Sequence, residues 1–127
     1  MPIARSAGRW REASWSCSLT PVTFGGYSSE LKKALDHLAP NILPILARFG
    51  GETHHPMRYD RTPALAVFGI LPEPDAECEK IFETLVRRNV LNMRPPVWVS
   101  GVFFRSQSPD GVPERIRDLL DRARATR

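Results

Sequence analysis

The chain has few of the residues that stabilise secreted or membrane proteins. Its two cysteines, Cys17 and Cys78, are too few for a disulfide framework and form no C-x-x-C pair. No apolar run approaches the ~18 residues that a bilayer span requires. With 127 residues, 42% hydrophobic and 25% charged, the composition predicts one globular domain in the cytoplasm, without a membrane partner.

The chain also lacks a concentrated surplus of positive charge. Its formal net charge of +4 comes from the two ends, because residues 1–18 and 105–127 each carry a net charge of +2. Residues 19–104 hold nine basic and nine acidic side chains. A phosphate-binding surface needs a basic patch, so the sequence predicts no nucleic-acid partner.

Periodic patterning is missing from the first 18 residues, which are rich in Arg, Ser, Ala and Gly. We therefore expect an irregular N-terminal segment over 1–18 and a folded domain over 19–127. From Leu19 onward, defined elements are expected. A first strand is predicted around Leu19–Phe24, and the apolar runs at 64–71 and 97–104 predict two further strands covered on both faces.

Apolar stripes at helical spacing predict three helices, near residues 28–39, 75–89 and 113–124. Between the first helix and the strand at 64–71, Pro40 and Pro44 interrupt regular structure. We interpret this stretch as a broken or second short helix that ends at Gly50-Gly51. The resulting alternation of strands and helices predicts an open α/β fold with a parallel, three-layer sheet. Only three strands are expected, so the chain resembles half of a doubly wound domain.

The loop after the first strand is the first place to look for a site, because ligands bind beyond the carboxyl ends of strands in open α/β sheets. Gly25-Gly26 would let the backbone approach a flat ligand, and Phe24 and Tyr27 could bracket an aromatic ring. The alternative is that the two glycines form only a tight turn before a capped helix.

Three stretches carry a family resemblance. They read TPVTFGGYSSELKKALDHL from Thr20, GGETHHPMRY from Gly50 and FETLVRRNVLNM from Phe82. Together they resemble the C-terminal half of the flavodoxin-like NAD(P)H-dependent FMN reductases. The resemblance implies FMN as cofactor and NAD(P)H as electron donor, with the chemistry carried by the flavin and no catalytic side chain. Lys32 and Asp36 match the family helix and are expected to be structural.

Carried over position by position, the family's flavin-ring contacts fall on one loop. The expected cofactor-binding residues are Pro21, Thr23, Phe24, Gly25, Gly26, Tyr27 and Ser28. The family's first strand, Ser/Thr-rich phosphate loop and following helix have no counterpart in residues 1–18, which are not family-like. We therefore expect a partial flavodoxin-like fold that lacks the N-terminal strands and the phosphate loop.

The expected function is that of an FMN-binding, NAD(P)H-dependent oxidoreductase, and whether this chain is active alone stays open. The alternative is a non-enzymatic α/β fragment that self-associates or binds a protein partner. An open sheet edge and uncovered apolar faces are adhesive, so a homo-oligomer is expected.

Two further features invite a chemical interpretation. His54 and His55, with Glu52 or Asp60, could suggest a metal site, but adjacent residues of an extended segment point to opposite sides. Hydrogen bonding within a loop is favoured, and no metal is expected. The H-x-x-R-Y element at 55–59 resembles a structured family loop near the flavin edge or a dimer contact. Cys78 falls on a helix stripe and is expected in the core.

Overall fold

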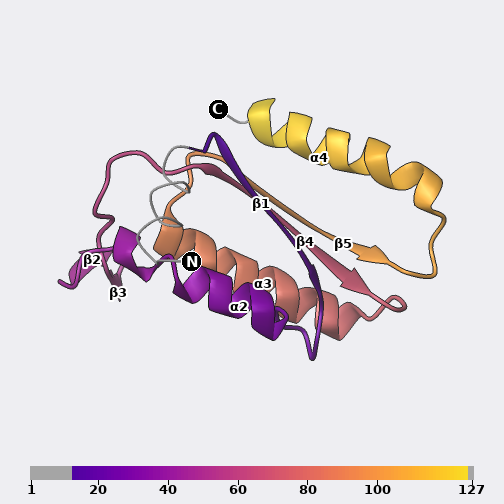
Figure 1. The fold of residues 1–127 in the computed structure, drawn as a ribbon, viewed down its shortest axis with the longest axis horizontal. Helices are drawn as coiled ribbons and strands as arrows, with labels where there is room; N and C mark the ends of the chain where they lie inside the picture. The colour runs from indigo at the N-terminus through magenta and orange to yellow at the C-terminus, as the bar shows by residue number, and fades with distance from the viewer. Residues whose placement is uncertain (1–12, 126–127) are drawn as a thin grey trace.

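The computed structural model describes residues 13–125 of the chain. Its main sheet contains three parallel strands in the order β1-β4-β5. These strands are β1 (Trp15–Pro21), β4 (Ala64–Leu71) and β5 (Trp98–Phe104). The fold is mixed α/β, and the predicted parallel pairing of the strands at 64–71 and 97–104 is confirmed (Figure 1).

The helices cover the sheet unequally. Helices α2 (Ser29–Asp36) and α3 (Ala76–Met93) lie on one face, and α4 (Val112–Ala125) lies on the other (Figure 1). All three predicted helices are present, and α3 extends four residues beyond its predicted end at 89. Two short 3-10 turns, η1 (Ala39–Asn41) and η2 (Pro109–Gly111), complete the helical elements of residues 13–125.

Side-chain alternation along the strands produces two apolar layers. On the α3 face, Phe82 and Val86 are fully buried against alternate residues of β4 such as Leu65 and Val67. On the α4 face, Phe68 and Phe103 form an edge-to-face pair with ring centroids 5.8 Å apart. The predicted α4 stripe packs onto this second layer, and its members are Ile116, Leu119, Leu120 and Ala123.

The N-terminal boundary differs from the prediction. Strand β1 begins at Trp15, four residues before the predicted boundary at Leu19, so residues 15–18 are regular structure. It ends at Pro21, and the predicted strand residues 22–24 instead lead into a turn. Its Ser16, Ser18 and Thr20 occupy the α2–α3 side, and Thr20 is only 1% exposed. The polar side chains thus point inward, which hides the first four residues of the strand from a search for buried apolar residues. Residues 1–12 of the predicted irregular segment lie outside the described residues.

The predicted broken helix before Gly50-Gly51 is wrong in its second half. After η1 the chain forms a hairpin from β2 (Ala47–Phe49) and β3 (Glu52–His54). Gly50 and Gly51 have φ values of 56° and 85°, so they form its two-residue turn. Glycines with positive φ occur both at helix ends and in hairpin turns, so the glycine pair alone does not distinguish the two. In this chain the pair forms a hairpin turn.

Candidate functional site

A tight turn follows β1 at the carboxyl end of the sheet. Thr23 N donates to Gly26 O over 3.0 Å, and Gly26 N donates to Thr23 O over 2.8 Å. The two central residues, Phe24 and Gly25, both have positive φ, at 51° and 80°. This geometry is that of a type I′ turn, which places residues 24 and 25 at the tip.

Phe24 has an unusual backbone conformation in this turn. A bulky side chain rarely adopts positive φ, because its Cβ crowds the neighbouring carbonyl. Its ring is 98% exposed, so no apolar burial offsets the strain. Backbone strain of this kind concentrates at ligand sites. The exposed ring of Phe24 is thus available to a flat ligand, while its positive φ is also what the type I′ turn itself requires.

The two glycines of the turn have different surroundings. Gly25 is buried against α3, and a Cβ at its position would lie 2.5 Å from Ile81 Cγ2. A Cβ at Gly26 would meet only Thr23 O, at 3.4 Å. Gly25 is thus required by the fold, whereas Gly26 leaves its backbone open to a neighbour.

Tyr27 and Ser28 face the protein rather than the tip of the turn. The Tyr27 ring packs edge-on against Phe82 with centroids 5.7 Å apart, and its hydroxyl accepts a hydrogen bond from Asn89 Nδ2 over 2.9 Å. Burial raises the pKa of the Tyr27 hydroxyl above its usual value. Ser28 Oγ caps α2 by accepting from Leu31 N over 3.3 Å. Both residues anchor the loop, while Pro21, Thr23 and Phe24 are exposed on it.

The start of α3 lies beside the turn. Asp75 caps α3 by accepting from the backbone N–H groups of Glu77 and Cys78, each over 3.0 Å. These bonds, that of Cys78 foremost, lower the pKa of the Asp75 carboxyl. The pKa of the Cys78 thiol is raised, mainly by its hydrogen bond with Asp75 and to a smaller extent by burial. A raised pKa disfavours the reactive thiolate. Cys78 packs on the α3-side core as predicted.

These groups fit a flavin ring better than a flavin phosphate. An exposed aromatic side chain and open backbone at Gly26 suit a flat ring. A phosphate prefers a free helix N-terminus, but the carboxylate of Asp75 already occupies that of α3, and Ser28 caps α2. Glu77 adds a further negative charge in the first turn of α3.

His54 and His55 bind separate partners at the other end of the molecule. His54 Nε2 lies 2.9 Å from Glu52 Oε2 and its Nδ1 lies 3.0 Å from Asn92 Oδ1, whereas His55 Nδ1 lies 2.9 Å from Ile45 O. The contacts with Glu52 and Ile45 are the expected local hydrogen bonds, whereas the contact of His54 with Asn92 of α3 was not predicted. Within residues 13–125, no three metal-ligating side chains form a group.

The H-x-x-R-Y element is a structured loop. Arg58 N donates to Asn41 O over 2.9 Å, and its Nε donates to Pro40 O over 2.9 Å. The element precedes β4, so it lies at the opposite end of the sheet from the turn at residues 23–26 (Figure 1).

Glu52 joins the β2–β3 hairpin to α3. Arg88 binds both of its carboxylate oxygens, at 3.0 and 2.8 Å. The hydrogen bonds from Arg88 first, and then from His54, lower the pKa of Glu52. Its pKa in the unfolded chain is about 4.3. Ionised Glu52 thus stabilises the fold above about pH 4.3, and this contribution disappears as pH falls through the lower folded-state pKa.

We expect this link to be visible as a pH-dependent difference between wild type and Glu52→Gln. Urea denaturation should show wild type to be more stable near pH 7, and the difference should shrink to nothing at the acid end. Glu73→Gln removes the same charge from an exposed loop and should match wild type. A constant difference between wild type and Glu52→Gln at every pH would contradict the role of the ionised carboxylate.

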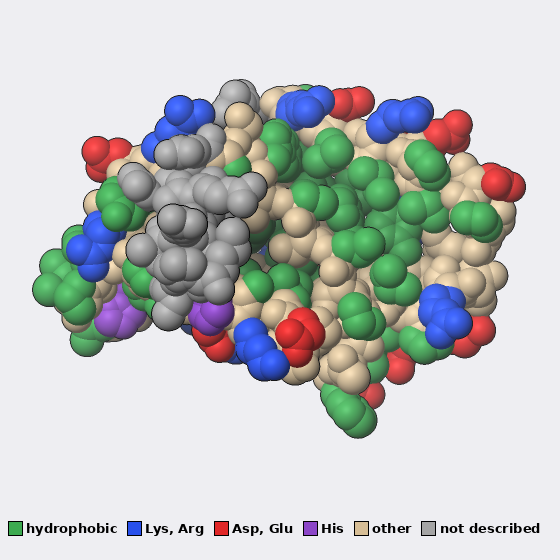
Figure 2. Space-filling model, viewed as in Figure 1, with side chains coloured by type: hydrophobic (Ala, Val, Ile, Leu, Met, Phe, Trp, Pro, Cys, Tyr) green, Lys and Arg blue, Asp and Glu red, His purple; other side chains and the backbone are tan. Residues whose placement is uncertain are grey.

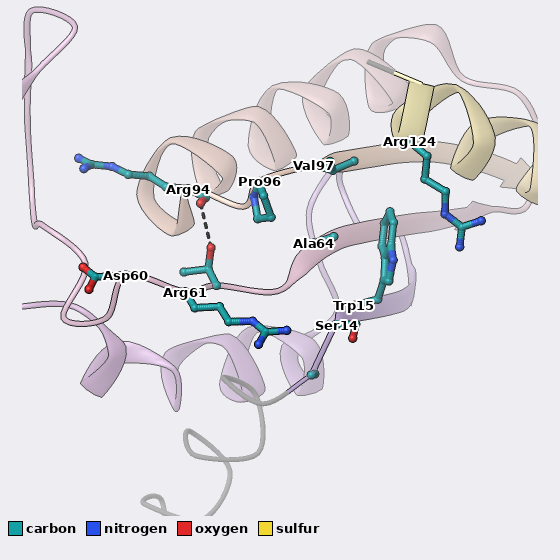
Figure 3. Close-up of a pocket in the computed structure, with 11 residues that line it drawn as sticks. Ser14, Trp15, Asp60, Arg61, Ala64, Arg94, Pro96, Val97 and Arg124 are labelled. Carbon is teal, nitrogen blue, oxygen red and sulfur yellow. Dashed lines mark hydrogen bonds between the residues drawn. The ribbon is translucent and has the colours of Figure 1, made fainter. Parts of the chain in front are cut away.

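A cavity of about 720 Å³ lies at the amino end of the sheet, away from the turn (Figure 3). Arg61, Arg94 and Arg124 line it together with Asp60, and the side chains of Arg61 and Arg124 extend on either side of Trp15 (Figure 3). The sequence did not predict this cluster of arginines. Arg61, Arg94 and Arg124 are spread over more than 60 positions of the chain and belong to no motif.

A second cavity, of about 520 Å³, lies between α2 and α3 and is lined mainly by apolar groups.

No helix within residues 13–125 is long and apolar enough to cross a bilayer. Comparison with protein-family models, curated proteins and solved structures found no match to the chain.

Proposed function

We propose that the chain binds a flavin at the turn of residues 23–26 and acts as a flavodoxin-like, NAD(P)H-dependent FMN reductase. The observation that carries the proposal is Phe24, which is almost fully exposed and held at positive φ at the carboxyl end of the sheet. Strain and exposure together are expected where a ring is to be stacked. The resemblance over residues 19–127 supplies the identity of the ring.

The order of the described elements agrees with this proposal. In a flavodoxin-like sheet of order 2-1-3-4-5, the last three strands are adjacent and parallel, as β1, β4 and β5 are. The helix after the last strand then lies opposite the preceding two, as α4 does (Figure 1). Under this proposal, the turn after β1 is the counterpart of the loop with which the family binds the isoalloxazine ring.

Within this proposal the residues of the chain have binding roles. Phe24 stacks on the ring, the backbone at Gly26 approaches its edge, and exposed Thr23 can donate or accept a hydrogen bond. Tyr27 and Ser28 hold the turn in place through α3 and α2. The bound flavin supplies the redox chemistry by accepting hydride from the nicotinamide.

The position of Asp75 sets the expected ligand preference. Because a carboxylate caps the nearest helix, the phosphate of FMN should contribute little to the binding affinity. FMN and riboflavin should therefore bind with affinities within about threefold of each other. Both should bind more weakly than FMN binds to a protein with a free phosphate-binding helix.

Flavin fluorescence titration tests the site. Phe24→Ala should weaken riboflavin binding about three- to tenfold, because one aromatic contact is lost. Gly26→Val should also weaken it by blocking the approach of the ring to the backbone. Phe49→Ala removes a partly exposed aromatic ring from the far hairpin and should leave the affinity unchanged.

Equal affinity for wild type, Phe24→Ala and Gly26→Val would remove this turn from the site. Activity is tested separately, by following oxidation of NADH and of NADPH in the presence of added flavin. Turnover by the purified chain that falls in Phe24→Ala supports the reductase assignment. Flavin binding without turnover would leave a flavin-binding protein and reject the enzyme.

A further inference from the structure

Within residues 13–125, strand β1 presents an open backbone edge. Ser14 O accepts from Ala64 N and Val22 N donates to Ile70 O, so the even-numbered residues of β1 bond to β4. Backbone groups alternate along a strand, and therefore Trp15, Cys17 and Leu19 direct their N–H and C=O groups away from the sheet. Among the described residues, β4 is the only strand that pairs with β1.

This edge carries none of the usual features that prevent pairing. The strand contains no charged residue, its register with β4 is unbroken over seven pairs, and its one proline, Pro21, stands at the end. Proteins that keep an edge strand free usually place a lysine, a bulge or an internal proline there. The edge of β1 is thus suited to accept another strand.

The side chains of the same residues extend the surface. Odd-numbered residues of β1 point to the α4 face, where Leu19 is 65% exposed and Cys17 is exposed. Figure 2 shows hydrophobic side chains gathered on this side of the molecule, between α4 at the top and α2 below. An open backbone edge and an apolar strip therefore occupy one continuous surface.

The two ends of this surface differ in charge. At the amino end, Arg61, Arg94 and Arg124 line the cavity beside Trp15 (Figure 3). They outnumber Asp60 and Asp121, the second of which pairs with Arg124 over 3.5 Å. Beyond Pro21 at the carboxyl end lies the acidic start of α3, with Asp75 and Glu77. An antiparallel neighbour of the same sequence would place each basic end against an acidic end.

We propose that two copies of the chain form a twofold-symmetric dimer by antiparallel pairing of β1 with β1 of the second copy. The pairing joins two three-stranded sheets into one of six strands, with the axis near Cys17 and Ser18. A second copy is the occupant that fits, because the edge is self-complementary in hydrogen bonding and its charges are complementary only in the antiparallel sense. This inference does not depend on flavin binding.

Sedimentation velocity of the full chain tests the proposal. Wild type should approach twice the 14.3 kDa of the chain as concentration rises, and added salt should weaken the association. Leu19→Lys should raise the dimer dissociation constant about tenfold or more, because it places a charge on the edge. Leu46→Lys is the matched control: Leu46 is 66% exposed on a loop away from β1, and this variant should behave as wild type.

Cross-linking locates the interface independently. Near the twofold axis the two Cys17 side chains are directly opposite or about 7 Å apart. A short bis-maleimide should therefore join two Cys78→Ser chains and fail to join two Cys17→Ser chains. A wild type that stays monomeric, equal weakening by Leu19→Lys and Leu46→Lys, or cross-linking through Cys78 alone would each overturn the proposal. Circular dichroism checks that each variant is folded.

Discussion

Phe82→Ala is expected to lower the free energy of unfolding by about 3–5 kcal/mol. The Phe82 side chain is 1% exposed and fills the space between α3 and the central strand. It lies directly over Gly69, where a Cβ would come within 2.9 Å of Phe82 Cζ. Its removal leaves a cavity in the α3-side core and takes away the edge-on partner of Tyr27.

Urea denaturation followed by circular dichroism measures this effect. Phe24→Ala makes the same chemical change at a 98% exposed position and should alter stability by less than about 0.5 kcal/mol. Similar losses in both variants would mean that Phe82 does not occupy the core as described.

Gly25→Val should destabilise the protein by about 2–5 kcal/mol, through positive φ and overpacking. Its φ is +80°, and an added Cβ would lie 2.5 Å from Ile81 Cγ2 and 2.6 Å from Ile81 Cβ. Ile81 belongs to α3, so the side chain cannot be accommodated without moving the turn from the helix.

Gly26→Val is the matched control, because the Cβ at this position meets only Thr23 O at 3.4 Å. Its stability should fall by less than about 1 kcal/mol. Thermal melting of the two variants distinguishes them. Equal destabilisation would show that the turn does not pack on Ile81 as described, and it would also prevent the use of Gly26→Val as a test of flavin binding.

Much of the fold can be predicted from the sequence because its central elements follow simple rules. The run ALAVFGIL at 64–71 is apolar throughout, as a strand covered on both faces must be. Asp75 and the spacing of Phe82 and Val86 mark a capped helix with one buried stripe. These local signals agree with the tertiary structure, so strand, helix and parallel pairing all follow from them.

The first four residues of the edge strand escape prediction because their pattern is inverted, and only Leu19–Pro21 falls within the predicted strand. Trp15, Cys17 and Leu19 alternate with Ser16 and Ser18, which is a strand signal of period 2. Its apolar residues, however, lie on the face of the sheet that α4 covers only in part. Its serines lie on the opposite face, toward α2 and α3. A count of alternation would have found residues 15–18 of this strand, whereas a search for buried apolar runs does not.

The candidate site is only partly predictable for a different reason. The glycine pair predicts a turn, but the inward direction of Tyr27 depends on Phe82 and Asn89, more than 50 residues later. The exposure of Phe24 likewise depends on how the turn packs against α3. Contacts between distant segments decide which loop residues anchor the turn and which remain available to a ligand.

The most direct test of the proposed flavin site is an amide NMR titration of the full chain with FMN and, in parallel, with riboflavin. Both ligands should shift the resonances of residues 22–28, and the shifts should be nearly the same because the phosphate finds no free helix N-terminus there. Shifts centred on Trp15, Arg61 and Arg124, or no shifts at millimolar flavin, would contradict the account.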